Sequence, residues 1–377
     1  MRSNKFKKVL FISTFVLNMG FSAESKAQYE SWEIGPRTLP ASVDVSDIFH
    51  ESLLKTPAPD VSQFKIVIST DDEWEAFAKE KNAPASKAAL TLAEALKVTI
   101  NNEKIAGVNV HRLTPKEISE EHRNHLFIYV HGGAWILNEG YAGTVEAIII
   151  AQRLKIEVIS IDYRMIPQYP APAATDDVVA VWKELIKVNS PSSIAIGGSS
   201  AGGNITLSSV HKFKDLGLPV PGALYLGTPC VDLNMTGDSR FLNEGVDRLL
   251  PAWKNIPQDA ARMYAGEFDL KNPYVSPIYG NFSDFPPSYI ISGTRDLLLS
   301  DAVRGHRALR RAGVDADLHI YEGQSHGDYA VVFNAPESVE HYAELNAFLL
   351  KHLLKSILPK AIDENMNNIE VPKSSIY

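Results

Sequence analysis

Residues 198–203, Gly-Ser-Ser-Ala-Gly-Gly, constrain the fold of this chain more than any other stretch, and they come just after the apolar residues 194–196. A serine with a glycine two positions away on either side is typical of a sharp strand-to-helix turn, because small glycines let strand and helix approach closely. This spacing selects Ser200, and not Ser199, as the exposed hydroxyl. The sequence therefore predicts a strand, a tight turn and a helix that together present a candidate nucleophile.

A second glycine-rich turn lies upstream, where His-Gly-Gly-Ala-Trp at residues 131–135 follows the strand-like residues 126–130. Acyl transfer needs N–H donors aimed at the developing oxyanion, and backbone amides supply them without a charge that must be desolvated. The residue after the nucleophile can supply a further donor. We therefore expect an oxyanion hole with donors drawn from four residues: Gly132, Gly133, Ala134 and Ala201.

Two segments nearer the C-terminus supply a candidate acid and a candidate base. Asp296 follows the strand-like residues 288–292, and His326 follows the apolar run at residues 318–321. A serine hydroxyl needs a base to take its proton, and that base needs a carboxylate to fix its tautomer and stabilise the imidazolium. Functional loops of an open α/β sheet gather just after its strands. The sequence thus predicts that Ser200, Asp296 and His326 form a catalytic triad.

Both the acid and the base have structural alternatives. Asp296 precedes the helical pattern that begins at residues 297–301, so it could instead be a carboxylate at a helix N-terminus. Asp301 is then the alternative acid. His326 could be a structural loop histidine, although the flanking Gly323 and Gly327 make that interpretation less favoured.

At this point the chain resembles the bacterial relatives of hormone-sensitive lipase within the α/β-hydrolases. The resemblance rests on the motifs above, on Asp162-Tyr163-Arg164 and on Pro-Ala-Pro-Ala-Ala at residues 170–174, and it spans roughly residues 110–350. It implies an α/β-hydrolase fold, with a mostly parallel central sheet flanked by helices and an N-terminal cap or arm. It also implies serine carboxylester hydrolysis with no metal and no organic cofactor.

Two residues depart from the pattern of that family. Ala134 stands where the family usually has a third glycine, and Ser199 stands where it usually has an aspartate. An alanine keeps its backbone N–H, so the oxyanion hole is expected to survive, although the methyl group could narrow the acyl pocket. The serine at 199 removes a charge beside the nucleophile and could change the network that supports it.

Alternating strand-like and helix-like runs predict a mainly parallel sheet. Strands are expected at residues 108–110, 126–130, 157–161, 194–196, 223–226, 289–291 and 318–321. Helices are expected at residues 45–54, 85–97, 143–154, 175–188 and 201–213. Pro84 is suited to the start of the second helix. N-terminal helices often cap the site in the family that the chain resembles, and the alternative is a helix that only packs on the domain.

The N-terminus has the features of a secretory signal peptide: a basic start, the mostly apolar residues 9–23, and Ser25-Lys26-Ala27. We expect a secreted or periplasmic protein that is cleaved after Ala27 and has no stable membrane insertion. A retained anchor is the alternative. Four regions are predicted: a signal peptide at 1–27, an N-terminal arm and possible cap at 28–105, the catalytic domain at 106–360 and a polar tail at 361–377.

Composition limits the partners of the chain. Its 377 residues are 45% hydrophobic, enough for a large core, and its formal net charge of -8 argues against nucleic acid or an anionic membrane as the main partner. The only cysteine, Cys230, cannot form an internal disulfide. Metal binding is disfavoured, because His-Glu-x-x-His and Cys-x-x-Cys motifs are absent and His111, His122 and His125 lie in a charged, solvated connection. The sequence carries no signal for oligomeric state.

Substrate identity is the least constrained property. Trp135, Leu137 and Tyr141, with Asn138, follow the oxyanion loop and are expected to line a substrate pocket, although Trp135 could equally belong to the core. The resemblance extends to secreted esterases that cleave lactones or bulky xenobiotic esters, which favours a small or medium ester as the small-molecule partner. The alternatives are an amidase or peptidase with the same triad, and a non-catalytic ligand-binding protein of the same fold. Retention of His326 argues against the latter.

Overall fold

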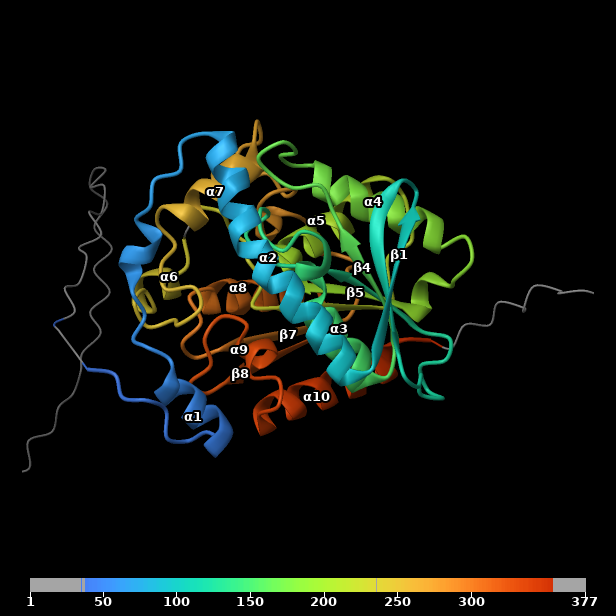
Figure 1. Cartoon of the computed structure of the whole chain (residues 1–377). Helices are drawn as coiled ribbons and strands as arrows, with labels where there is room; N and C mark the ends of the chain where they lie inside the picture. The colour runs from blue at the N-terminus through green and yellow to red at the C-terminus, as the bar shows by residue number, and fades with distance from the viewer. Residues whose placement is uncertain (1–34, 36–37, 235, 355–377) are drawn as a thin grey trace, which may run out of the picture. The chain divides into compact units, whose positions relative to one another are not determined.

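Within the residues that the computed structural model describes, eight strands form one sheet in the order β1-β2-β4-β3-β5-β6-β7-β8 (Figure 1). β1 pairs antiparallel with β2, and β2 with β4, whereas all other neighbours are parallel. The strands are β1 (Val98–Ile105), β2 (Val108–Pro115), β3 (Leu126–Val130), β4 (Glu157–Asp162), β5 (Ile194–Ser199), β6 (Ala223–Gly227), β7 (Ser288–Gly293) and β8 (Ala316–Tyr321). The predicted fold class, an α/β fold with a mostly parallel sheet, is confirmed.

The structure describes residues 35, 38–234 and 236–354. The chain divides into two units, Met1–Leu39 and Pro40–Tyr377, and the sheet lies in the second. The predicted signal peptide, its cleavage point after Ala27 and the predicted polar tail lie outside the described residues.

Helices cover both faces of the sheet. The helices of the described residues are α1 (Asp47–Lys55), α2 (Asp71–Leu96), α3 (Val145–Leu154), α4 (Ala173–Leu185), α5 (Ala201–Asp215), α6 (Ser239–Leu242), α7 (Ile256–Ala265), α8 (Leu299–Arg311), α9 (Asp328–Val331) and α10 (Pro336–His352). Short 3-10 turns occur at η1 (Val61–Phe64), η2 (Gly140–Thr144), η3 (Pro191–Ser193) and η4 (Pro277–Tyr279). Residues of α3 and α10 pack in one apolar cluster, and residues of α4, α5, α7 and α8 pack in another.

The central strands show why two clusters form. Every residue of β3 is buried, and alternate side chains point to opposite faces: Phe127 and Tyr129 join the α3 cluster, while Ile128 and Val130 join the α5 cluster. β5, β6 and β7 are likewise buried throughout. A continuous apolar run is what a strand needs when helices cover both of its faces.

The first strand was not predicted from the sequence. β1 (Val98–Ile105) is largely polar and partly exposed because it lies at the edge of the sheet. It is joined to β2 through Ala106 and Gly107, both with positive φ, which is the backbone of a tight two-residue hairpin. The pairing of this hairpin, and not an alternation of apolar residues, identifies the strand.

The long helix α2 corrects a second expectation. It begins at Asp71 and contains Pro84 in its interior, so the predicted start at Pro84 is wrong. The helix begins with a capping box: Thr70 Oγ1 accepts from Glu73 N (3.3 Å), and Glu73 Oε2 accepts from Thr70 N (3.2 Å). Figure 1 shows α2 crossing diagonally over the region of α3 and the sheet.

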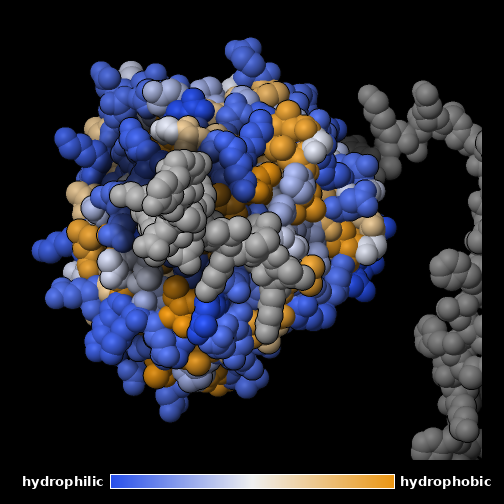
Figure 2. Space-filling model, turned by 90° about the vertical axis from the view of Figure 1, so that its right-hand side faces the viewer, coloured by the Kyte–Doolittle hydropathy of each residue, from blue (hydrophilic) through white to orange (hydrophobic). Residues whose placement is uncertain are grey.

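Among the described residues, none of the helices combines the length and the apolar character that crossing a membrane requires. Figure 2 shows one face of the molecule, on which hydrophilic residues cover most of the visible coloured surface and hydrophobic residues form small groups between them.

We expect Thr70→Ala to lower the free energy of unfolding by about 1 kcal/mol, because it removes the side-chain oxygen that caps the first turn of α2. Chemical denaturation followed by circular dichroism measures the change. Thr91→Ala is the matched control, since Thr91 is exposed in the interior of the same helix, where alanine is the better helix former. Equal losses in both variants would contradict a capping role.

Candidate active site

Ser200 lies in the turn between β5 and α5, with φ 59° and ψ −120°. A positive φ is uncommon for a residue with a side chain, and the surrounding structure must hold it. Ser200 N donates to Gly227 O (2.8 Å), and Ser200 O accepts from Asn204 N and Cys230 N (3.2 Å each). The strained turn is thus fixed by β6, by α5 and by the segment that follows β6.

The glycines around Ser200 are required by close packing. A Cβ atom added to Gly198 or to Gly202 would come within 1.9 Å of Val130 O, at the end of β3. One on Gly203 would lie 2.9 Å from Pro229 Cβ. The glycine spacing that marks the motif in the sequence therefore reflects how closely β3, β5 and α5 approach each other.

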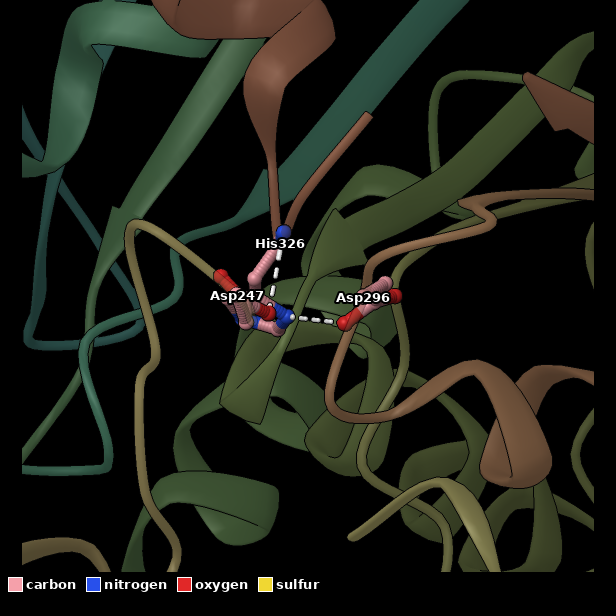
Figure 3. Close-up of side chains that lie close together, drawn as sticks. All are labelled: Asp247, Asp296 and His326. Carbon is pink, nitrogen blue, oxygen red and sulfur yellow. Dashed lines mark hydrogen bonds and ion pairs between the residues drawn. The ribbon is translucent and has the colours of Figure 1, made fainter. Parts of the chain in front are cut away.

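His326 and Asp296 are in direct contact (Figure 3). His326 Nδ1 lies 3.0 Å from Asp296 Oδ1. The Asp296 carboxylate is fully buried, and it also accepts from Leu298 N (2.9 Å) and Ser292 Oγ (2.6 Å). A proton held on Nδ1 leaves His326 Nε2 free to accept a proton from a substrate or a nucleophile.

Three carboxylates act on the charge state of this histidine. Burial by itself lowers the pKa of His326, but the negative charges of Asp296, Asp247 and Asp328 outweigh burial and raise the pKa above its usual value. The His326 side chain is 14% exposed, so solvent screens these charges only in part. The three carboxylates therefore stabilise the protonated, imidazolium form of His326.

Ser200 and His326 line the same cavity, with a volume of about 460 Å³. Gly132, Gly133 and Ala134 line it as well, and a Cβ on Gly132 would lie 3.2 Å from Ser200 Cβ. The structure thus brings the glycine-rich turn after β3 against the strained serine after β5.

The backbone of this turn presents its amides in an unusual conformation. Gly133, Ala134 and Trp135 have successive positive φ values of 114°, 51° and 60°. Within the described chain, the N–H groups of Gly133, Ala134 and Ala201 have no acceptor. Asn138 Nδ2 donates to Gly132 O (3.1 Å), which helps to hold the turn. Unpaired amides beside a nucleophile can bind an anionic oxygen.

The structure corrects two of the predicted substrate contacts. Leu137 lines the cavity with Ser200, but Trp135 is 2% exposed and stacks on Tyr264 with ring centroids 4.7 Å apart. Trp135 therefore belongs to the core. Tyr141 lines a different cavity, where its ring stacks on His111 and its hydroxyl accepts from Asn102 Nδ2 (2.8 Å).

Several cavity residues could not be anticipated from motifs. They come from η1, from α2 and from the start of α7 and the segment before it: Phe64, Phe77, Lys81, Leu249, Leu250, Ile256 and Pro257. Most are apolar side chains far from the motifs in the sequence, and only the fold brings them to the cavity.

Asp301, the alternative acid, is bound elsewhere. It is fully buried in an ion pair with Arg240 (2.9 Å), and its Oδ2 accepts from Val231 N (2.8 Å) and Asp232 N (3.1 Å).

Burial raises the pKa of the Cys230 thiol to about 12, so this cysteine is not a thiolate nucleophile at neutral pH.

The histidines expected in a solvated connection are in fact buried. His111 lies in β2 with Nδ1 2.8 Å from Asn102 Oδ1, and His122 Nδ1 lies 3.0 Å from His125 Nδ1. His122 Nε2 is 2.8 Å from Asn346 Oδ1. These contacts give the rings structural roles in the interior.

Ser199, the residue that departs from the family pattern, belongs to a buried polar cluster. Its Oγ lies 2.8 Å from the Tyr329 hydroxyl. Close by, Glu146 on α3 accepts from the hydroxyls of Tyr129 and Tyr225 (2.7 Å each) and contacts Ser199. Burial raises the pKa of Glu146. A carboxyl group is thus present beneath the turn, although residue 199 does not supply it.

Comparisons with known proteins agree with this geometry. A family model described as the alpha/beta hydrolase fold matches residues 127–330. An esterase from Acinetobacter venetianus is 27% identical over 256 residues, 67% of this chain and 82% of the relative. The carboxylesterase NlhH from Mycobacterium tuberculosis is 28% identical over 230 residues, 56% of this chain and 69% of the relative.

Solved structures are similar over most of the chain. The crystal structure of an esterase called E25 has a TM-score of 0.84 and 47% sequence identity, covering 86% of this chain and 99% of that one. An esterase from the bacterial hormone-sensitive lipase family has a TM-score of 0.63 and 26% identity, covering 77% of this chain and 100% of that one.

We expect Gly202→Ala to destabilise the protein by about 3 kcal/mol or more, because the new methyl group would overlap Val130 O. Thermal and chemical unfolding measure the loss. Gly305→Ala in α8 is the matched control, since its Cβ would meet only Val231 Cγ1 at 3.6 Å, and helix propensity favours alanine there. Similar stabilities for the two variants would refute the packing argument.

Proposed function

Because this chain belongs to the α/β-hydrolase family, among the bacterial relatives of hormone-sensitive lipase, and is a carboxylic ester hydrolase, we propose that it cleaves small or medium esters through an acyl-enzyme on Ser200. One observation carries the proposal. Ser200 shares a cavity with His326, whose Nδ1 is held 3.0 Å from the buried Asp296 carboxylate.

The reaction follows from the roles of these groups. His326 Nε2 takes the proton of Ser200 as Oγ attacks the ester carbonyl, and Asp296 stabilises the imidazolium. When the tetrahedral intermediate collapses, the carbon–oxygen bond to the alcohol breaks and His326 gives its proton to the departing alcohol. Water, deprotonated by His326, then attacks the acyl-enzyme, and Ser200 regains a proton as the acid leaves.

The backbone N–H groups that lack an acceptor near Ser200 support the proposed oxyanion hole. Gly133, Ala134 and Ala201 offer N–H groups around Ser200, and Gly132 packs against the serine. Negative charge develops on the carbonyl oxygen only in the transition state and the intermediate. Donors that are already oriented toward that position stabilise it without further reorganisation.

The cavity supports the proposed substrate size. A volume of about 460 Å³ is in the range of small-molecule sites. Its wall includes Phe64, Phe77, Leu249 and Ile256, which suit an apolar acyl or alcohol group. We include lactones and bulky xenobiotic esters among the candidate substrates. Because η1 and α2 contribute Phe64 and Phe77, we also propose that the N-terminal region serves as a cap.

We expect Ser200→Ala to lower kcat for p-nitrophenyl acetate by about 10⁴-fold or more, because the acyl-enzyme cannot form. Circular dichroism checks that the variant folds. Ser199→Ala is the matched control, since it removes one hydrogen bond to Tyr329 and is expected to cost less than about tenfold. An organophosphonate should label the wild-type protein at Ser200.

Wild-type activity in Ser200→Ala would refute the assignment of the nucleophile. An ester series tests the substrate class separately. We expect kcat/KM to fall as the acyl chain becomes longer than the cavity, whereas efficient cleavage of an emulsified long-chain triglyceride would refute the proposed size range. Faster cleavage of matched amides than of esters would favour the amidase alternative.

We also propose that the protein is secreted or periplasmic, on the strength of the basic and apolar N-terminus that ends in Ser25-Lys26-Ala27. When the full chain is expressed in a Gram-negative host, the protein recovered from the periplasm or medium is expected to begin at Gln28. N-terminal sequencing measures this. Recovery of a form that begins at Met1 in the cytoplasm or the membrane would count against the proposal.

A further inference from the structure

Asp247 lies in the α6–α7 segment, residues 243–255, and its side chain is fully buried beside His326 and Asp296 (Figure 3). In the described chain its carboxylate accepts from four backbone N–H groups. Oδ1 accepts from Leu249 and Leu250 (2.9 Å each), and Oδ2 accepts from Leu297 (2.8 Å) and His326 (3.2 Å). Both oxygens are therefore occupied by donors from the chain itself.

These four donors belong to three different parts of the site. Leu297 lies in the acid loop, residues 294–298, and His326 lies in the base loop, residues 322–327. Leu249 and Leu250 line the cavity wall. A carboxylate that accepts from all three parts fixes their spacing, because hydrogen bonds to an ionised acceptor are short and strong.

We propose that Asp247 is a positioning residue for ester hydrolysis, which holds the base loop, the acid loop and one wall of the cavity in a fixed relation. The proposal rests on the roles proposed above for Ser200, Asp296 and His326. It extends the site beyond the three triad residues, to a group that touches the backbone of the base and not the substrate.

The next residue, Arg248, ties the same segment to Ser325 and Asp328, which flank His326 in the sequence. Arg248 N donates to Ser325 Oγ (3.1 Å), and Arg248 Nε donates to Asp328 Oδ1 (2.9 Å). Its Nη1 donates to Ser52 Oγ (3.1 Å) and to Thr56 Oγ1 (2.9 Å), the residue after α1. The α6–α7 segment thus holds the base loop at Ser325 and His326, and the start of α9 at Asp328.

The charges around His326 predict a signature in the pH profile. The groups that face His326 are Asp296, Asp247 and Asp328, with Glu146 from α3 and with Arg248 paired to Asp328. Burial and the nearby charge of Asp296 raise the pKa of Asp247 to about 6, so Asp247 is ionised above this pH. Its negative charge helps to raise the pKa of His326.

The sign of the effect follows from the role of the base. Only neutral His326 can take the proton of Ser200, so kcat/KM rises as the pH rises through the pKa of His326. Removing the charge of Asp247 lowers that pKa. The acidic limb of the profile therefore moves to lower pH when Asp247 becomes neutral.

We expect Asp247→Asn to lower kcat for p-nitrophenyl acetate by about tenfold or more, because an amide cannot accept from all four N–H groups. The acidic limb of kcat/KM is expected to move down by about half a pH unit or more. Steady-state kinetics from pH 5 to about pH 9 measure both effects. Wild-type kcat with an unmoved limb would overturn the proposal.

Asp247→Glu separates position from charge. It keeps the negative charge but lengthens the side chain, so kcat is expected to fall while the acidic limb stays near its wild-type place. If Asp247→Asn does not fold, this variant carries the test, and wild-type kcat in it would overturn the proposal. Asp177→Asn is the matched control: it neutralises a buried aspartate that pairs with Arg164 away from the cavity, and its kcat and limb are expected to stay wild-type.

Labelling by an organophosphonate distinguishes this proposal from the function on which it rests. Failure of the wild-type protein to react at Ser200 would refute the acyl-enzyme, whatever the variants do. If the wild-type protein reacts, slower labelling of Asp247→Asn with unchanged stoichiometry supports the positioning role. A lowered melting temperature with wild-type kcat, limb and labelling rate would mean a purely structural role and would overturn the proposal.

Discussion

The active site depends on one close approach, between the carbonyl oxygen of Val130 at the end of β3 and the glycines on either side of Ser200. No Cβ fits at Gly198 or Gly202, because each would lie 1.9 Å from that oxygen. β3 pairs with β5 so that Val130 lies beside Gly198. The turn after β3 and the turn after β5 therefore leave the sheet side by side. A nucleophile and a set of unpaired amides meet because two neighbouring strands end together.

The buried carboxylates in and around the site fall into two groups, and the difference explains which negative charges act on His326. Asp301 and Asp328 pair with Arg240 and Arg248. Among the described residues, Asp296 and Asp247 have no arginine or lysine partner and accept instead from backbone N–H groups, Ser292 and His326. Amides stabilise a carboxylate without cancelling its charge. The negative charges of Asp296 and Asp247 therefore lie beside His326, the residue that becomes an imidazolium in each step of the reaction.

The sequence alone predicted the structural elements that a local pattern of residues determines. The central strands and the helix after Ser200 lie within a few residues of their expected positions, because continuous apolar runs and glycine spacing leave few alternatives. β1 was not predicted because an edge strand can be polar. The start of α2 was placed at Pro84, whereas the capping box of Thr70 and Glu73 marks the true start. Asp247 could not be predicted, since two of its donors lie 50 and 79 residues away. Trp135 and Leu137 are only two positions apart in the sequence, but Trp135 packs in the core and Leu137 lines the cavity. This difference depends on tertiary packing and not on a local pattern.

Ser199 belongs to a buried polar cluster with Glu146 and Tyr329. Glu146 on α3 accepts from Tyr129 on β3 and Tyr225 on β6, and it contacts Ser199 on β5, so one carboxyl group joins three adjacent strands just below Ser200. An aspartate at 199 would place a second acid against this buried group, and like charges in a low dielectric are costly. A serine instead contacts the carboxyl group and forms a hydrogen bond with Tyr329. The small residue at 199 therefore avoids placing a second acid beside the buried Glu146 carboxyl group.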